Sequence, residues 1–513
     1  MSDLRILVVE NNINWQDELR KILQRLGPDV HIDVCSNYND ALPYARHEYY
    51  DLAIIDLALL IEPSDSQNSD QLGMDLLREL RNSSQNRGCG LLVLSGYVTK
   101  ARTRLAFRDY DADDVIDKND FDNLVFINTV RETILNARLR QAASRNSARY
   151  YLNITFNYES LLSSELTGPN RRALHLAEHP LRFDASDLAR RADNLNLLVL
   201  RGGAEIWRPE ASSIGTAIYN HLSKEGRVLA DLTSARALAQ RLDNLWLQFT
   251  GPATGLGIPF ELLRDADDYL ALDHVLTRRI IKADGVSRNL EQFHSFIHRM
   301  QERSETLRIL IVGANHDGAI PLAEDEAVSL YETMRVDLQR LGLRHEILLL
   351  VGSEATYSRV RAELRYGGYH IFHYAGHGSY QGALPESSGL ILKEGTESRV
   401  LTAAELNLLL RDLNLQMVFL SCCLGARTAT QIGRGDFYGM LEAIARADVP
   451  TVLGYRWTVA DRSAIFLAKH FYNVLWRTFS PGDALLAARR DVAMEYGRDD
   501  ETWASPVLLM QNV

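Results

Sequence analysis

Short apolar runs alternate with amphipathic stretches over the first 140 residues. Leu4 to Val9 is the first run, and Leu19, Ile22 and Leu26 recur at helical spacing in the stretch that follows. The alternation repeats through HIDVCS, YDLAIIDLAL, GLLVLSGY and DDVIDKND, with helical stretches between them. Strands and helices that alternate in this way form parallel sheets covered on both faces. We therefore expect residues 1–140 to form a doubly wound α/β domain.

Residues 141–300 follow a less regular pattern. The stretch NLVFINTVRETILNARLRQAASRN is rich in good helix formers and predicts a long helix that continues from the first domain as a connector. YYLNITFNYE, LNLLVLRG, LWLQFTG and IIKADG then predict strands of an accessory α/β part, in which no catalytic cluster stands out. For Glu261, in the fragment GIPFELL, we expect a carboxylate hydrogen-bonded to backbone at a sharp turn, and the alternative is a buried charge with a functional role.

Residues 301–513 return to a regular alternation. LRILIVGAN, EILLLVG, YHIFHYAG and LQMVFLSC have the pattern of buried strands and are separated by helical stretches. This order predicts a layered α/β domain with parallel strands. The whole chain is therefore expected to be α/β, with domains at 1–140, 141–300 and 301–513.

Two of these predicted strands end in residues suited to covalent catalysis. HIFHYAG brings His373 and His377 toward its carboxyl end, and LQMVFLSC ends at Cys422, which Cys423 follows. A thiol beside an imidazole forms an attacking thiolate, and the imidazolium can then protonate a leaving amine without a metal. Because neighbouring strand residues point to opposite faces, only one of the two cysteines can face His377.

The histidine and cysteine segments also carry a family resemblance. HIFHYAGHG and MVFLSCCLG resemble the paired motifs of CHAT domains, a family of bacterial caspase-like peptidases. GIPFELL, LTAAEL, VPTVLGYRWTVAD and WASPVLL match the family in order, from about residue 150 to 513. His377 lies 46 residues before Cys423, which fits the caspase spacing of about 50. The resemblance implies a cysteine endopeptidase that cleaves a protein substrate without a cofactor.

The resemblance implies individual roles as well. Cys423, two positions before the glycine of the motif, is the expected nucleophile, His377 the expected general base, and Cys422 a small buried filler. The backbone N–H groups of Gly378 and Cys423 are the expected oxyanion donors. For His373 we expect support of the strand or of the base, and the alternative is that it takes the proton itself.

Three side chains are candidates for selecting the substrate residue before the cut bond. Asp317, in the loop ANHDGAIPLAEDE, and Asp461, after YRWTV, would each favour Arg or Lys by charge pairing, unless they are ordinary solvated carboxylates. Trp457 either lines a subsite or packs in the core. The polar loop GARTATQIGRGD after Cys423 is a candidate for ordering or self-cleavage during activation.

Composition excludes several other classes of function. The net charge of −11 opposes a surface that follows phosphates, so no nucleic-acid partner is expected. Four cysteines are too few and too unevenly spaced for a disulfide framework or a zinc site. The amino terminus lacks a secretory signal and no apolar run reaches about 18 residues, so we expect a cytoplasmic protein without a membrane segment.

The predicted strand ends of the first domain gather a second polar set, Glu10, Asn11, Asp56, Ser95 and Lys118. Such groups meet at the carboxyl edge of a parallel sheet. Their order resembles the receiver domain of two-component response regulators. The resemblance makes Asp56 the phosphoacceptor, Glu10, Asn11 and Asp56 the holders of a Mg²⁺ ion, Ser95 the switch hydroxyl and Lys118 the phosphate partner. A histidine kinase or another signalling protein would then be a partner.

Three positions depart from the receiver pattern. Asn11 stands where a second carboxylate is usual, Val115 replaces the switch aromatic residue, and Asn119 replaces the proline that follows the lysine. Both a working phosphoacceptor and a pseudo-receiver used for docking therefore stay open.

The two resemblances combine into one functional prediction. We expect a signal-regulated cysteine endopeptidase that receives its input through the receiver-like domain. The alternative is a catalytically silent scaffold, or a response regulator that acts by binding other proteins.

Overall fold

The computed structural model divides into two compact units. The first comprises Met1–Ser144, Val336–Arg344 and Trp476–Phe479, and the second comprises Arg145–Arg335, His345–Leu475 and Ser480–Val513. At some positions within helices and strands, Cys423 among them, the structure describes the backbone alone. The described residues are 4–62, 69–96, 106–107, 110–156, 161–182, 188, 191, 195, 204–223, 228–252, 256–265, 268–281, 290–315, 321–379, 385–424, 436–457, 459 and 461–512.

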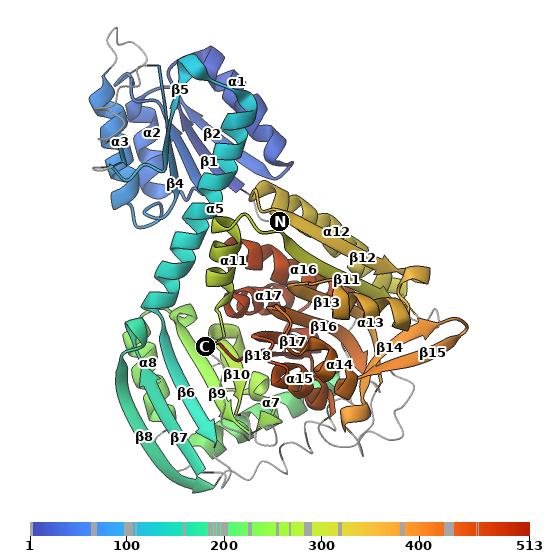
Figure 1. Cartoon of the computed structure of the whole chain (residues 1–513). Coiled ribbons are helices and arrows are strands. Elements are labelled where there is room, and N and C mark those ends of the chain that lie inside the picture. The colour runs from blue at the N-terminus through green and yellow to red at the C-terminus, as the bar shows by residue number, and fades with distance from the viewer. Residues whose placement is uncertain are drawn as a thin grey trace. The chain divides into compact units, whose positions relative to one another are not determined.

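The first unit is built on a five-stranded parallel sheet with the strand order β2-β1-β3-β4-β5. This is the order of doubly wound sheets of the receiver type, so the fold class expected from the alternation is confirmed. Figure 1 shows α2 and α3 on one side of the sheet and α1 and α5 on the other. The elements are β1 (Leu4–Val9), α1 (Ile13–Leu23), β2 (Val30–Cys35), α2 (Tyr38–His47), β3 (Leu52–Ile55), α3 (Asp70–Asn82), β4 (Gly90–Ser95), β5 (Asp114–Asp117) and α5 (Asn123–Ala148).

The middle strands of this sheet form its core. Every residue of β3 and of β4 is buried, as the unbroken apolar runs predict for strands covered on both faces. Helix α5 is 26 residues long and ends shortly before the first strand of the second unit. The long helix expected after the first domain is therefore present.

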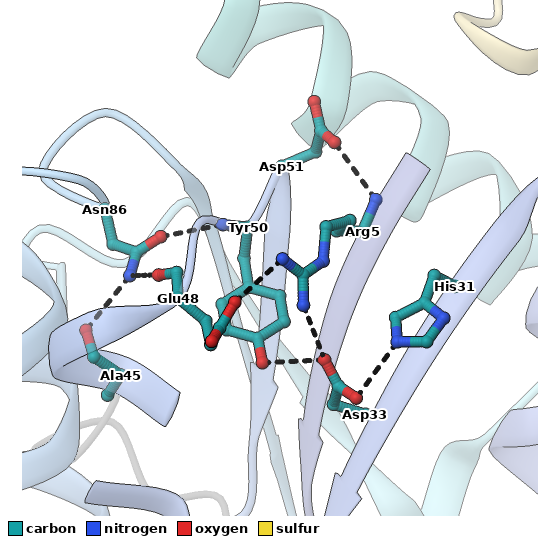
Figure 2. Close-up of polar contacts among 8 residues, drawn as sticks. All are labelled: Arg5, His31, Asp33, Ala45, Glu48, Tyr50, Asp51 and Asn86. Carbon is teal, nitrogen blue, oxygen red and sulfur yellow. Dashed lines mark hydrogen bonds and ion pairs between the residues drawn. The ribbon is translucent and has the colours of Figure 1, made fainter. Parts of the chain in front are cut away.

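A polar cluster joins the strands at the amino edge of the same sheet (Figure 2). The Arg5 guanidinium donates to Glu48 at 2.9 Å and to Asp33 at 3.3 Å, and the Tyr50 hydroxyl donates to Asp33 at 2.8 Å. The Tyr50 backbone N–H donates to the Asn86 side chain at 2.8 Å. These residues hold β1, β2 and the segment before β3 together, at the edge opposite the predicted phosphoacceptor.

The second unit contains a 13-stranded mixed sheet. Its main path runs β12-β11-β13-β16-β17-β18-β10-β9-β6-β7-β8, and the hairpin of β14 and β15 pairs with the end of β13. The strands are β6 (Tyr150–Phe156), β7 (Leu161–Thr167), β8 (Ala173–Arg182), β9 (Leu245–Gly251), β10 (Val275–Ile280), β11 (Leu307–Ala314), β12 (His345–Val351), β13 (Ile371–Ser379), β14 (Gly389–Glu394), β15 (Glu397–Thr402), β16 (Met417–Leu424), β17 (Thr451–Tyr455) and β18 (Pro506–Met510).

Helices cover this sheet, and its central strands run parallel. β11, β13, β16 and β17 pair in parallel, so their carboxyl ends meet at one edge. This agrees with the layered α/β fold expected for the carboxy-terminal part. The helices are α7 (Ala204–Ser223), α8 (Val228–Ala239), α10 (Leu270–Asp273), α11 (Phe293–Glu302), α12 (Pro321–Arg340), α13 (Tyr357–Tyr366), α14 (Ala403–Leu410), α15 (Asp436–Arg446), α16 (Asp461–Thr478) and α17 (Pro481–Glu495).

None of the helices within the described part of the chain combines the length and the apolar character that crossing a bilayer requires.

Candidate functional site

Strands β13 and β16 bring the candidate base and the candidate nucleophile to paired positions. The strands are parallel neighbours, with His377 paired to Cys423 and Gly376 paired to Cys422, and Figure 1 shows them side by side. Paired positions of neighbouring strands lie about 4.8 Å apart and share one face of the sheet. Positions 377 and 423 therefore share a face, and position 422 belongs to the other. Strand register thus joins two residues that are 46 positions apart in the sequence.

The cysteine doublet occupies the end of β16. Cys422 is 1% exposed, and it lies in the core, where a small filler was expected. His377 is half-buried at the end of β13. The position of Cys423 comes from its backbone pairing with His377.

His373 lies in a buried polar network. Its Nε2 atom is 3.0 Å from Oε1 of Glu326 on α12, and its Nδ1 atom is 3.2 Å from the hydroxyl of Tyr472 on α16. His373 is 0% exposed and Glu326 is 4% exposed. Four residues of a strand span about 13 Å, so His373 lies well before His377 along β13. With both ring nitrogens occupied, His373 fixes the strand against two helices.

Sequence reasoning missed Glu326 and Tyr472. Glu326 lies on the buried stripe of α12 together with Ala327, Leu330 and Met334. A carboxylate within an apolar stripe needs a partner, so the signal for a buried contact was present. The identity of the partner was not, because His373 lies on another element.

The residue proposed as an oxyanion donor follows His377 directly. Gly378 is buried, and it pairs with Leu424 of β16 on one side and with Leu390 of β14 on the other. The hairpin of β14 and β15 thus continues the sheet beyond the end of β11. Neighbouring strands therefore hold the backbone around Gly378 from both sides.

The candidate specificity residues lie in different environments. Trp457 is 1% exposed and its indole N–H donates to the carbonyl oxygen of Glu501 at 3.3 Å, which places this ring in the core. Asp461 is the exposed first residue of α16, and partial burial of its carboxyl, followed by the charge of Glu326, raises its pKa. Asp317 and the loop at residues 425–435 lie outside the described residues.

The receiver pocket is assembled at the carboxyl edge of the first sheet. The Lys118 ammonium lies 2.7 Å from Oδ2 of Asp56 and 2.6 Å from Oε2 of Glu10, so one cation joins both carboxylates. Asp56 is 4% exposed and Ser95, the last residue of β4, is 2% exposed. Burial and then the charge of Asp56 raise the pKa of Glu10, while Lys118 opposes this shift. The five residues singled out in the sequence therefore include three that meet through ion pairs.

The departures from the receiver pattern have structural roles. The Asn11 amide donates at 3.2 Å to the carbonyl oxygen of Ala58, two residues after Asp56. Val115 packs against the core of the first unit. The Asn119 amide donates to the carbonyl oxygen of Gly96 at 2.9 Å and to the carboxylate of Asp117 at 2.8 Å.

Two carboxylates and one amide are the oxygen ligands available to a magnesium ion. Oxygen donors of this kind suit Mg²⁺, but Lys118 lies between the carboxylates of Glu10 and Asp56, so a divalent cation must displace its ammonium group. Among the described residues, no group of three or more His, Cys, Asp or Glu side chains is arranged to hold a metal. A magnesium ion in this pocket would therefore be held by one carboxylate fewer than in the usual receiver pattern.

Glu261 differs from its expected environment. It is 0% exposed, and its Oε2 atom accepts from the Arg278 guanidinium at 2.6 Å, a side-chain partner in place of the expected backbone donor. Arg278 also donates to the Ile258 carbonyl oxygen at 2.7 Å. The carboxylate is therefore bonded to the arginine, and it is the arginine that contacts the backbone. A buried carboxylate is best compensated by a buried cation.

A family model described as the CHAT domain matches residues 213–511, which is more than half of the chain. The chain belongs to the CHAT domain family. The match includes β13 and β16, so both candidate motifs lie inside the CHAT domain. A search of curated proteins found no match.

Solved structures match the region before the CHAT domain. They include a CheY-like receiver domain protein from Methanospirillum hungatei JF-1, which is 19% identical, with 27% of this chain and 99% of that chain covered and a TM-score of 0.23. The receiver domain of a sensor histidine kinase from Pseudomonas aeruginosa PAO1, described with magnesium in its active site cleft, is 20% identical, with coverages of 26% and 98% and a TM-score of 0.22. At such scores the matches add no argument, and strand order establishes the receiver-like fold.

Proposed function

We propose that this chain is a signal-regulated cysteine endopeptidase whose CHAT domain cleaves a partner protein with Cys423 and His377. The observation that carries the proposal is the pairing of these two positions on neighbouring parallel strands. A Cys-His pair with this order of motifs is the machinery of caspase-like peptidases.

The proposed reaction follows from the chemistry of the pair. His377 accepts the thiol proton of Cys423, and the thiolate attacks the carbonyl carbon of the substrate. The N–H groups of Gly378 and Cys423 stabilise the negative oxygen that forms. The His377 imidazolium gives its proton to the leaving amine, and water then hydrolyses the thioester. No step requires a cofactor.

Of the two carboxylates that are candidates for substrate selection, Asp461 is the one within the described part of the chain. It is the first residue of α16, the helix that also contributes Tyr472 to the network around His373. A carboxylate in this position would favour Arg or Lys before the cut bond. Asp461→Asn should then reduce cleavage of substrates with Arg or Lys at that position and spare those with Leu.

The receiver-like unit is the proposed input. Asp56 would accept a phosphoryl group with Mg²⁺ held by Glu10, Asn11 and Asp56, and Lys118 would pair with the added charge. The ion pairs of Lys118 with both carboxylates equally suit a pseudo-receiver that binds a signalling partner.

Active-site labelling tests the peptidase proposal. Full-length wild type, Cys423→Ala and Cys422→Ala are treated with a peptidyl acyloxymethyl ketone, and the adduct is located by fragment mass spectrometry. Wild type and Cys422→Ala should carry the adduct on residue 423, and Cys423→Ala should carry none. If wild type stays unlabelled with and without acetyl phosphate and magnesium, the chain is a silent scaffold.

Acetyl phosphate tests the input separately. With magnesium it should change the labelling rate or the assembly state of wild type and leave Asp56→Asn unchanged, because an amide cannot accept the phosphoryl group. Titration calorimetry with MgCl₂ should show binding that Glu10→Gln weakens. An identical response of wild type and Asp56→Asn would exclude phosphoryl control and leave docking as the function of this unit.

A further inference from the structure

A buried tyrosine contacts the backbone of the proposed base. Tyr374 precedes His377 by three residues on β13 and is 0% exposed. Its hydroxyl oxygen lies 2.9 Å from the carbonyl oxygen of His377 and 2.8 Å from that of Ile391 on β14. The single proton of the hydroxyl can be donated to either carbonyl. Tyr374 therefore joins the strand end that carries the base to the neighbouring hairpin.

Gly376 provides the space that this contact needs. A Cβ atom at position 376 would lie 2.7 Å from the Tyr374 hydroxyl oxygen and 2.8 Å from the Ala314 carbonyl oxygen. Positions 374 and 376 share one face of β13, opposite the face of His377. The phenol ring can extend along the strand to the His377 carbonyl because residue 376 has no side chain.

The contact orients the donor that follows His377. The carbonyl of His377 and the N–H of Gly378 belong to the same planar trans peptide and point in opposite directions. A hydroxyl that fixes the direction of this carbonyl also fixes the direction of the N–H group. An oxyanion donor is effective when its direction is set before the reaction.

We propose that Tyr374 is a positioning residue for the oxyanion hole, whose hydroxyl holds the 377–378 peptide so that the Gly378 N–H faces the reacting oxygen. The inference rests on the proposed peptidase function. Complete burial, followed by the charge of Cys422, raises the pKa of Tyr374 well above its usual range, so the hydroxyl keeps its proton and stays a donor.

Tyr374→Phe tests this role because it removes only the hydroxyl. In the full chain, hydrolysis of a pool of fluorogenic peptidyl aminocoumarin amides should lose at least about tenfold in kcat with little change in KM, less than the ~10²–10³ cost of removing an oxyanion donor outright. Alkylation of Cys423 by iodoacetamide passes through no oxyanion, so its rate should stay within about twofold of wild type, since the Cys-His pair itself is untouched.

A matched control separates positioning from loss of a buried hydroxyl. Tyr50→Phe removes another buried hydroxyl, which donates to Asp33 in the receiver-like unit, and should leave kcat unchanged. If Tyr374→Phe fails to fold, Gly376→Ala should displace the Tyr374 hydroxyl and produce the same split between turnover and alkylation.

Several outcomes would overturn the inference. A Tyr374→Phe variant with the kcat of wild type would refute the inference and leave the proposed function standing. An equal fall in the alkylation rate and in kcat would also refute the inference, because it would indicate a general structural role. A wild type that neither hydrolyses the pool nor reacts with the acyloxymethyl ketone would refute the proposed function and the inference with it.

Discussion

At the scale of single residues, the second unit depends on charges that are completely buried. Glu261 and Arg278 are both 0% exposed, and Arg489 is 1% exposed nearby. Burial, with the charge of Arg278 acting in the same direction, lowers the pKa of Arg489 to about 10, although Glu261 opposes the shift. One carboxylate therefore compensates two guanidinium groups.

Removal of that carboxylate should destabilise the second unit strongly. Glu261→Ala leaves Arg278 and Arg489 without their negative partner, and breaking a buried pair in this way costs about 3–5 kcal/mol. Urea unfolding followed by circular dichroism measures the loss. The double variant Glu261→Met with Arg278→Met should recover part of it, and a double variant less stable than Glu261→Ala would contradict this account.

These residues show what the sequence could and could not predict. Glu261 was expected to be a hydrogen-bonded carboxylate within the fragment GIPFELL, and the structure has it completely buried. The partner was not predicted, since Arg278 lies 17 residues later, on β10. His377 and Cys423 were singled out because a histidine between two glycines and a cysteine doublet stand at the ends of predicted strands. For Glu326 the apolar stripe of its helix signalled a buried contact, but not which residue it contacts.

At the scale of elements, two turns fix the strands that precede and follow them. Asn86 lies after α3, yet its side chain serves the turn between α2 and β3. Its amide donates to the carbonyl oxygens of Ala45 at 3.0 Å and Glu48 at 2.7 Å, and its oxygen accepts from the Tyr50 N–H at 2.8 Å (Figure 2). Asn86 is 0% exposed, so water cannot replace these bonds.

Asn86→Ala should therefore destabilise the first unit by about 2–4 kcal/mol, because three buried backbone groups lose their partner. Asn86→Asp keeps the acceptor and loses two donors, and it should also be destabilising. Thermal unfolding of the full chain reports the change. An alanine variant as stable as wild type would mean that the turn is held by other contacts.

The second turn is the 3₁₀ helix Glu501–Trp503, which bonds to the end of β17 through Trp457. Burial raises the pKa of Glu501 from 4.5 to about 7. The folded chain therefore keeps this proton where the unfolded chain releases it, so the associated stability is present below pH 4.5 and is lost as the pH rises toward 7.

Glu501→Gln should remove that pH dependence, because an amide carries no proton to lose. The variant should gain in Tm relative to wild type between pH 5 and pH 8, with the gap widening as the pH rises. Other titrating groups contribute equally to both proteins and cancel in the difference. A gap that is constant or that narrows would show that the carboxyl of Glu501 is charged at neutral pH.

At the scale of the whole molecule, the two units have separate sheets and separate cores. We expect two thermal transitions in differential scanning calorimetry, since each unit has its own cooperative core. Asn86→Ala should lower the temperature of one transition and Glu261→Ala that of the other. A single transition that both variants shift equally would show that the units unfold together.

The fold class of the whole molecule could be predicted from the sequence, but which strands pair with one another could not. Alternating apolar runs predicted the parallel sheet of the first unit and the parallel central strands of the second, because the period of the pattern reports local structure directly. β6 to β10 share one sheet with the strands of the CHAT motifs, and this pairing depends on contacts between residues more than 100 positions apart, such as Arg278 with Leu509.

The pairing of His377 with Cys423 limits how this chain can change in length. The loop at 411–416 lies between the paired strands and takes no part in their pairing, so an insertion there would leave the two positions opposite each other. A single residue inserted within β16 would instead bring Cys422 opposite the histidine and turn position 423 to the other face. Evolution can therefore lengthen the connections of this chain without disturbing the pairing, but it can change the length of β16 only by two residues at a time if the pairing is to be kept.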